Sequence, residues 1–105
     1  MFAVIYSFEV KPGNDQKLID AWSGLTDLIY RHEGSLGSRL HHETGNRYLA
    51  YAQWPSREGW KEAGANMPAE AEKYRKAMKE SCLKIETLHE LNPVSDLLQT
   101  KPFSK

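Results

Sequence analysis

Cysteine is nearly absent from this sequence, since Cys82 is the only one among 105 residues. A single cysteine excludes an intrachain disulfide and a structural zinc site built on several thiolates. Because Cys82 lies in an apolar, strand-like segment, we expect a buried, unreactive thiol rather than a reactive one.

The sequence also lacks an excess of charge of one sign and a long apolar run. It contains 14 Lys and Arg and 14 Asp and Glu residues, which gives a formal net charge of zero. Phosphate binding requires clustered cations, so no nucleic-acid partner is expected. No apolar run reaches membrane-spanning length and no basic signal-peptide segment precedes the first strand pattern, so we expect a cytoplasmic protein without a membrane partner.

Metal-ligand spacing is missing as well. The adjacent residues His41 and His42 would point to opposite faces of a strand, so they cannot chelate one metal ion together. His32 and His89 stand alone, and no pairing of His, Asp and Glu has a spacing such as H-x-x-x-H. There is also no Gly-rich phosphate loop and no nucleophile–base pair. We therefore expect neither a metal nor a cofactor.

Strand and helix patterns alternate along a single domain, residues 1–105, with a core at 2–91. Apolar periodicity predicts strands at about 2–10, 36–43, 47–54 and 82–91, and helices at about 15–32, 57–63 and from 68 onwards. Gly34 suits the left-handed position after a helix, and Thr44-Gly45-Asn46 suits a hairpin turn. This order is the βαββαβ pattern of the ferredoxin-like α+β fold, an antiparallel sheet with its helices on one face.

The opposite face of that sheet would remain uncovered in a monomer. Ile5, Leu49 and Tyr51 would contribute to it, which leaves a larger apolar surface than a monomer usually exposes. We therefore expect a homodimer formed sheet to sheet. The C-terminal tail, residues 92–105, carries four more apolar residues that need a surface, and the partner subunit offers one: Val94, Leu97, Leu98 and Phe103.

Aromatic residues gather at one strand-to-helix corner, residues 47–60. The strand must break at Pro55, whose fixed φ and missing N–H cannot continue a central ladder. Ser56 then stands where a helix N-cap would stand, ahead of a short helix that carries Trp60. Such a corner either seals a small core or walls a pocket.

Three segments resemble the antibiotic biosynthesis monooxygenase domain. They are Val-Lys-Pro-Gly at 10–13, Gly-Ser-Leu-Gly-Ser at 34–38 and Tyr-Ala-Gln-Trp-Pro-Ser at 51–56. The resemblance covers about residues 2–91. It implies a dimeric α+β barrel with a pocket in each subunit between sheet and helices. Well-studied members oxygenate phenols and quinols with O2 and without a metal or flavin, and another branch degrades haem.

The quinone-forming branch of that family offers a partial match of site residues. Its pocket uses an Asn on the third strand, a Trp four residues later, a Tyr six residues after that Trp, and an Arg on the following helix. Trp54 matches the Trp and Arg75 matches the Arg. Trp60 stands at the Tyr position without a phenol group, and Ala50 stands at the Asn position and cannot hydrogen-bond a substrate carbonyl.

The haem-degrading branch matches less well. Its strand-one Asn falls at Tyr6, its helix Trp falls near Ala63, and its haem-ligating His falls near Lys73 or Tyr74. Haem degradation is therefore the least favoured activity.

Alternation along the third strand places four side chains on one face, which the resemblance turns toward the helices: Tyr48, Ala50, Ala52 and Trp54. The two alanines leave space that the two aromatic residues bound. Either Trp22 of the first helix fills this space as core, or the space is an apolar ligand pocket lined by aromatic residues.

Three more side chains are candidates for the chemistry. Arg75 could hold a phenolate, enolate or carboxylate, or it could pair with Glu70 or Glu72. His42 shares a strand face with the pocket residues, so it is either a general base or a hydrogen-bonded histidine at a rim or interface. Tyr74 is the second candidate proton acceptor.

Two functions remain open from the sequence. One is a cofactor-independent monooxygenase that acts with O2 on a small aromatic, quinol or polyketide-like molecule. The other is a non-catalytic small-molecule-binding dimer of the same fold, which the residue at position 50 favours. The candidate catalytic residues are Trp54, Arg75, His42 and Tyr74, and the candidate substrate-binding residues are Tyr48, Ala50, Trp60 and Trp22.

Overall fold

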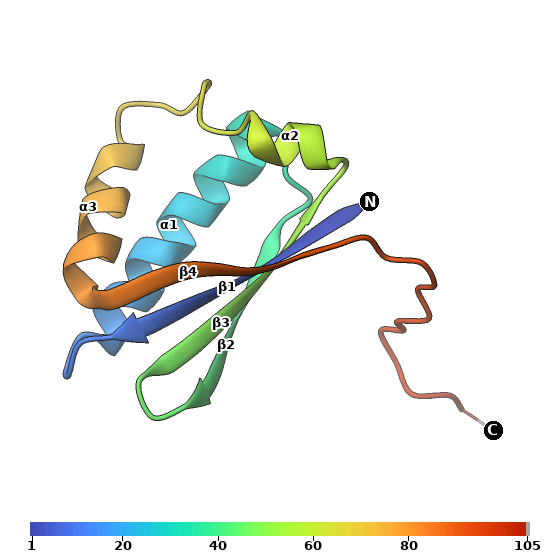
Figure 1. Cartoon of the computed structure of the whole chain (residues 1–105), viewed down its shortest axis with the longest axis horizontal. Coiled ribbons are helices and arrows are strands. Elements are labelled where there is room, and N and C mark those ends of the chain that lie inside the picture. Colours follow the sequence, from blue (N-terminus) through green and yellow to red (C-terminus); the bar gives the residue numbers. More distant parts are fainter. Residues whose placement is uncertain (105) are drawn as a thin grey trace.

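The computed structural model describes residues 1–104 and forms a four-stranded antiparallel sheet with its helices on one face (Figure 1). The elements in chain order are β1 (Phe2–Val10), α1 (Asp15–Glu33), β2 (Ser38–Thr44), β3 (Arg47–Trp54), α2 (Arg57–Lys61), α3 (Ala71–Ser81) and β4 (Cys82–Leu91). The strand order in the sheet is β2-β3-β1-β4. The predicted ferredoxin-like α+β fold is confirmed.

Most element boundaries agree with the sequence patterns, and the exceptions have local causes. β2 begins at Ser38 rather than at 36, because Gly37 adopts a φ of 97° that takes the backbone out of the extended conformation. α3 begins at Ala71 rather than at 68, after turns in which the Pro68 carbonyl accepts from the Ala71 N–H. α2 ends at Lys61, two residues earlier than predicted.

The predicted caps and turns are present. The Ser56 hydroxyl accepts a hydrogen bond from the Gly59 N–H at 3.0 Å, which starts α2 immediately after the strand. Gly34 takes the left-handed conformation after α1, with a φ of 76°. Ser56 therefore leads the chain from β3 into α2, and Gly34 ends α1 ahead of β2.

The core lies between the helices and one face of β1 and β3. On β3 the buried and half-buried residues alternate strictly, so the face with Tyr48, Ala50, Ala52 and Trp54 is the one that meets the helices. Cys82 is buried against this core, and burial raises the pKa of its thiol. The expectation of a buried thiol is confirmed.

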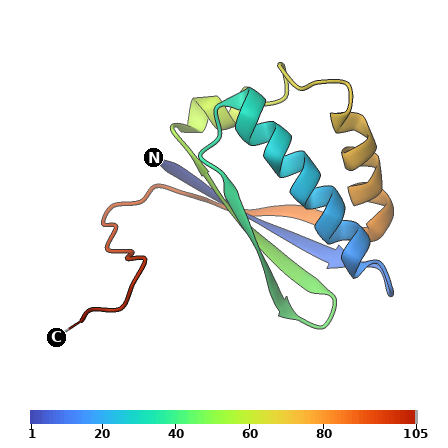
Figure 2. The same ribbon diagram turned by 180° about the vertical axis from the view of Figure 1, so that it is seen from behind.

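The other face of the sheet is bare, as the two opposite views show (Figures 1 and 2). Ile5, Leu49 and Tyr51 are half-buried there, and Leu91 is exposed. The described part of the C-terminal tail, residues 92–104, leaves the end of β4, and its first residues line a shallow space together with Met1 and Tyr51. Its apolar residues are almost fully exposed, at 97% for Val94 and 90% for Phe103.

None of the helices within residues 1–104 combines the length and the apolar character that crossing a lipid bilayer requires.

Helices α1 and α3 pack closely where Gly24 faces Tyr74. A Cβ atom built on Gly24 would lie 2.3 Å from Cε1 of the Tyr74 ring, well inside van der Waals contact. Glycine within a helix costs roughly 1 kcal/mol relative to alanine. The close ring contact explains why this position nevertheless carries glycine.

The substitution Gly24→Ala should therefore destabilise the protein although alanine is the better helix former. Overpacking of this kind costs about 1–3 kcal/mol, which exceeds the gain of about 1 kcal/mol in helix propensity. Urea unfolding measures the difference.

The matched control is the same substitution in a Tyr74→Ala background, where the ring is gone. There, Gly24→Ala should stabilise the protein by about 1 kcal/mol. Stabilisation in both backgrounds would show that the ring contact does not limit the helix packing.

Candidate functional site

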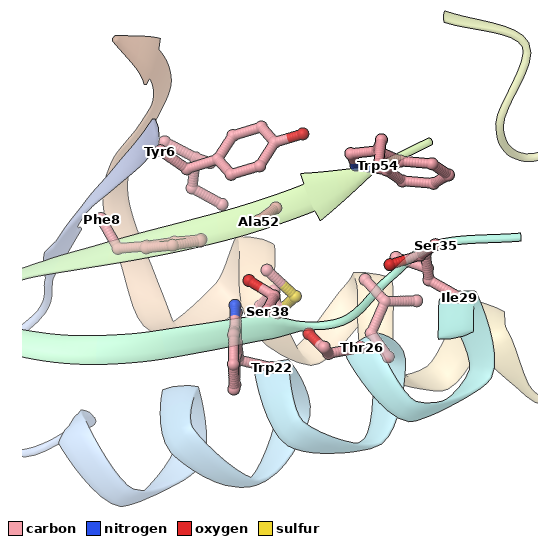
Figure 3. Close-up of a pocket in the computed structure, with 12 residues that line it drawn as sticks. Tyr6, Phe8, Trp22, Thr26, Ile29, Ser35, Ser38, Ala52 and Trp54 are labelled. Atoms are coloured by element: carbon pink, nitrogen blue, oxygen red, sulfur yellow. The ribbon is translucent and has the colours of Figure 1, made fainter. Parts of the chain in front are cut away.

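An apolar space that is partly open to solvent, here called the central cavity, lies between the helix-covered face of the sheet and helices α1 and α3 (Figure 3). Its volume is about 210 Å³. The lining side chains come from both strands and helices: Tyr6, Phe8, Trp22, Leu25, Thr26, Ile29, Ser35, Ser38, Ala52, Trp54, Met78 and Ile85. Trp22 is thus a wall of the cavity, and it does not fill the space that the small residues of β3 leave.

Among residues 1–104, no charged side chain lines the central cavity. Its polar groups are neutral, and two of the hydroxyls already have backbone partners. The Ser35 Oγ accepts from the Gly37 N–H at 2.8 Å, and the Ser38 hydroxyl donates to the Tyr51 carbonyl at 2.9 Å. A ligand in this cavity therefore meets mainly hydrocarbon and a few neutral hydrogen-bonding groups.

Trp54 brings an unused hydrogen-bond donor to the cavity wall. The residue is only 4% exposed, and its indole Nε1–H has no acceptor among residues 1–104. Buried donors nearly always have a partner, because an unpaired one costs about 1–3 kcal/mol. The N–H is covered by protein atoms, so it becomes a contact for a ligand oxygen atom only where a neighbouring side chain shifts.

Tyr6 forms a further part of the cavity wall and is tied to the aromatic corner. The Trp60 Nε1–H donates to the Tyr6 Oη at 2.7 Å, and the Trp60 ring packs on Phe2 with centroids 5.6 Å apart. Burial raises the pKa of Tyr6, and the hydrogen bond from Trp60 offsets only part of that effect. The phenol therefore stays protonated at neutral pH.

A second space, here called the Arg75 cavity, adjoins the central cavity. It measures about 240 Å³, and Trp60, Met67 and Arg75 lie in its walls. Both cavities share four wall residues: Tyr6, Leu25, Ile29 and Trp54. The structure therefore brings Trp54, Trp60 and Arg75 together on one side of the shared wall.

Arg75 is only loosely engaged by other protein groups. Its Nη1 lies 3.7 Å from Oε2 of Glu72, one turn away on the same helix, and both side chains are substantially exposed. Exposed ion pairs of this kind contribute at most about 1 kcal/mol. The guanidinium group thus remains available to an anionic group in the Arg75 cavity.

The two candidate proton acceptors lie outside the central cavity. Tyr74 packs its ring on Gly24 of α1. Successive side chains of a helix point in different directions, so Arg75 lines the Arg75 cavity while Tyr74, the residue before it, points to the neighbouring helix. His42 is exposed near the β2–β3 hairpin, where its Nε2 lies 2.9 Å from the Gly45 carbonyl oxygen. The structure therefore separates both groups from Trp54.

Tyr48 and Ala50 also lie away from the central cavity, although they share its strand face. The Tyr48 hydroxyl donates to the Asp15 carboxylate at 2.6 Å, which raises the pKa of Tyr48 and ties β3 to the start of α1. Its ring packs against the His42 ring in a tilted arrangement, with centroids 4.8 Å apart and an interplanar angle of 41°. Ala50 is 1% exposed and belongs to the hydrophobic core.

Sequence reasoning did not single out Tyr6, Thr26, Ser35 or Met78 as site residues, yet all four line the central cavity. One signal was available for the first of them. Alternation along β1 places Tyr6 on the helix-facing side, and in the sheet it lies directly opposite Ala50. The pairing register between β1 and β3, which brings Tyr6 opposite a small residue, forms only in the folded sheet and could not be predicted from the alternation of either strand.

The loop between α2 and α3 closes one side of the Arg75 cavity and is held by a single carboxylate. Glu33, in the last turn of α1, accepts hydrogen bonds from the backbone N–H groups of Gly64 and Asn66, the latter at 2.8 Å. These bonds lower the pKa of Glu33 below its ordinary value of 4.5. The carboxylate thus fastens the loop that carries Gly64 and Met67 over the cavity.

No cluster of three or more His, Cys, Asp or Glu side chains suited to a metal ion occurs in the part of the chain that the structure describes.

Comparisons with known proteins agree with this geometry. The family model described as antibiotic biosynthesis monooxygenase matches residues 1–80. A search of curated protein sequences gives no match. Among solved structures, SnoaB, a cofactor-independent oxygenase from Streptomyces nogalater, is 16% identical and superimposes with a TM-score of 0.74, covering 93% of this chain and 97% of its own.

A second solved structure, Rv0793 from Mycobacterium tuberculosis, is 17% identical with a TM-score of 0.71. The match covers 92% of this chain and 98% of Rv0793. At such low identities these likenesses establish the shared fold.

The Glu33 contact predicts a pH-dependent loop. A carboxyl group with a lowered pKa contributes stability that is present above its ordinary pKa and is lost as the pH falls through the folded value. At neutral pH, Glu33→Gln should therefore speed amide hydrogen exchange at Gly64 and Asn66 about two- to fivefold, the scale of exposed charged contacts. The difference from the unsubstituted protein should shrink as the pH falls below 4.5.

The control is Glu62→Gln, which removes a neighbouring exposed carboxylate and should leave both amides unchanged. Equal exchange in the Glu33→Gln variant and the unsubstituted protein at neutral pH would refute the role of Glu33 in holding the loop.

Proposed function

Because the chain belongs to the antibiotic biosynthesis monooxygenase family, we propose that it is a cofactor-independent monooxygenase that oxidises a small phenol or quinol with O2. The observation that carries this proposal is the central cavity, an apolar space with the buried, unpartnered N–H of Trp54 in its wall. Such a cavity suits a flat aromatic ring that bears an oxygen atom.

The cavity volume favours substrates of one or two rings. A buried apolar cavity of about 150 Å³ is sufficient to bind benzene. The central cavity measures about 210 Å³, which is more than this volume but less than twice it. It therefore has room for one ring or two fused rings. A longer, polyketide-like molecule would have to extend past the shared wall into the Arg75 cavity.

The proposed reaction begins with transfer of the substrate hydroxyl proton to solvent. The resulting anion gives one electron to O2, which leaves a substrate radical and superoxide. Their recombination forms a carbon–oxygen bond at a ring carbon that carries hydrogen, and the peroxide anion takes back one proton from solvent. The hydroperoxide then breaks its O–O bond and loses water together with the hydrogen on that carbon, which leaves a carbonyl group and the second oxygen atom in the water. The apolar lining of the cavity limits the contact of the radical pair with water while this happens.

The residues divide between orientation and charge stabilisation. Trp54 would hold the substrate oxygen through its N–H, and Trp22 would form one wall for the ring. Arg75, beyond the shared wall, would favour the anion electrostatically. Since no carboxylate or imidazole lines the central cavity, the site favours substrates that ionise readily without a neighbouring base.

Oxygen consumption with a panel of hydroquinones, naphthohydroquinones and anthrones tests this function. Turnover above the autoxidation background is expected for one- and two-ring members. Trp54→Phe keeps a ring but removes the N–H, so it should lower the rate by roughly tenfold or more, the value of a buried hydrogen bond to a charged group.

The matched control is Tyr48→Phe, on the same face of the same strand but outside the central cavity. It loses the bond to Asp15 and some stability, and it should keep its turnover. Absence of turnover in folded protein that still binds panel members would favour the second function, a non-catalytic small-molecule-binding protein.

The functional unit in this proposal is a homodimer formed through the bare face of the sheet. Near the β2–β3 edge of that face the Arg39 guanidinium lies 5.8 Å from the centroid of the Tyr51 ring, and the Gln53 amide donates to the Tyr51 hydroxyl at 3.1 Å. Ile5 and Leu91 add apolar surface on β1 and β4. An ordered aromatic and apolar surface of this kind is typical of a dimer interface.

Sedimentation at micromolar concentration should give a mass of about twice 12.0 kDa. Ile5→Glu places a charge on the bare face and should shift the protein to monomers. Gln16→Glu adds the same charge on the exposed side of α1 and should leave the dimer intact. A stable monomer in the unsubstituted protein would overturn the dimer, and truncation after Asn92 measures what the tail contributes.

A further inference from the structure

We propose that Tyr6 is a substrate-binding residue whose hydroxyl donates a hydrogen bond to a ligand oxygen, beside the N–H of Trp54. The inference rests on the proposed function and deepens it. It identifies the ligand class as a one- or two-ring aromatic molecule that carries a carbonyl or phenolate oxygen on one edge.

The hydrogen-bond direction at Tyr6 leaves its own proton free. An indole N–H can only donate, so in the 2.7 Å contact with Trp60 the Tyr6 Oη is the acceptor. The phenol hydrogen is then available, and no acceptor for it is found among residues 1–104. The bond from Trp60 also fixes where the hydroxyl lies, which reduces the entropy lost when a ligand binds.

The position of Tyr6 depends on its neighbour across the sheet. Tyr6 of β1 pairs directly with Ala50 of β3, so a large side chain lies beside a methyl group on the helix-facing side. The space that Ala50 leaves free lets the tyrosine ring lie along the cavity wall. Figure 3 shows the hydroxyl end of Tyr6 pointing toward the ring of Trp54.

Two donors without an acceptor therefore belong to residues of the cavity wall, the Tyr6 hydroxyl and the N–H of Trp54, which is itself covered by protein atoms. Their complement is a group with two lone pairs, such as a carbonyl or phenolate oxygen, because such an oxygen can accept from two neutral donors at once. No side chain of the cavity carries a charge that would require a charged ligand. Burial raises the pKa of Tyr6, which keeps the hydroxyl proton in place at neutral pH.

The test compares two ligands that differ by one carbonyl oxygen, 1-tetralone and tetralin, through quenching of tryptophan fluorescence without any turnover. The measured quantity is the affinity ratio of ketone to hydrocarbon. Tyr6→Phe should lower this ratio by about three- to tenfold, the range of one hydrogen bond. Tyr48→Phe, whose hydroxyl is bound to Asp15 outside the cavity, should leave it unchanged.

An unchanged ratio in Tyr6→Phe overturns the proposal, and retained tetralin binding shows that the cavity of the variant is intact. If the variant does not fold, an NMR measurement on the unsubstituted protein tests the same proposal. With 13C at the tyrosine Cζ atoms, tetralone should shift one of the five tyrosine signals and tetralin should not. Trp60→Phe assigns that signal, because it removes the bond to Tyr6. No ketone-specific shift of that signal also overturns the proposal.

This experiment separates the two proposals. Failure of the monooxygenase function would appear as absent oxygen consumption while the Tyr6-dependent preference for the ketone persists. Failure of the Tyr6 proposal would appear as a ratio that does not depend on Tyr6, whether or not the protein consumes oxygen.

Discussion

Small side chains in the middle of β3 are the constraint on which the site depends. Ala50 and Ala52 face the helices between two buried aromatic residues, Tyr48 and Trp54. Since protein interiors pack closely, a space beside small residues is normally filled by a neighbour. Tyr6 occupies the place beside Ala50, whereas the space beside Ala52 stays open as the central cavity.

The surrounding contacts keep that space open. Gly24 allows the Tyr74 ring to pack against α1, so α3 lies close to α1 without its tyrosine entering the cavity. The Tyr6 hydroxyl is held by Trp60, and Tyr48 is held by Asp15. Tyr6 is thus held at the cavity wall by its partner, whereas the buried N–H of Trp54 has no acceptor among residues 1–104.

The sequence predicted the fold well because strand alternation, cap residues and turn residues act locally. The N-cap at Ser56, the left-handed Gly34 and the two faces of β3 all follow from a few neighbouring residues. The site was predicted only in part. Trp54 and Trp22 were recognised and line the central cavity, whereas Tyr6 was not, because its place opposite Ala50 depends on the register between two strands far apart in sequence. His42 was assigned to the correct face of β2, but distance along the strand separates it from Trp54.

The wall between the two cavities has a consequence for how substrate range can change. It consists of four side chains, Tyr6, Leu25, Ile29 and Trp54, that face one small space on each side. Trimming Leu25 or Ile29 would join two modest compartments into one elongated chamber without altering the sheet. If the proposed activity is correct, one or two substitutions in this wall would change the accepted ring system from compact to extended while the fold stays the same.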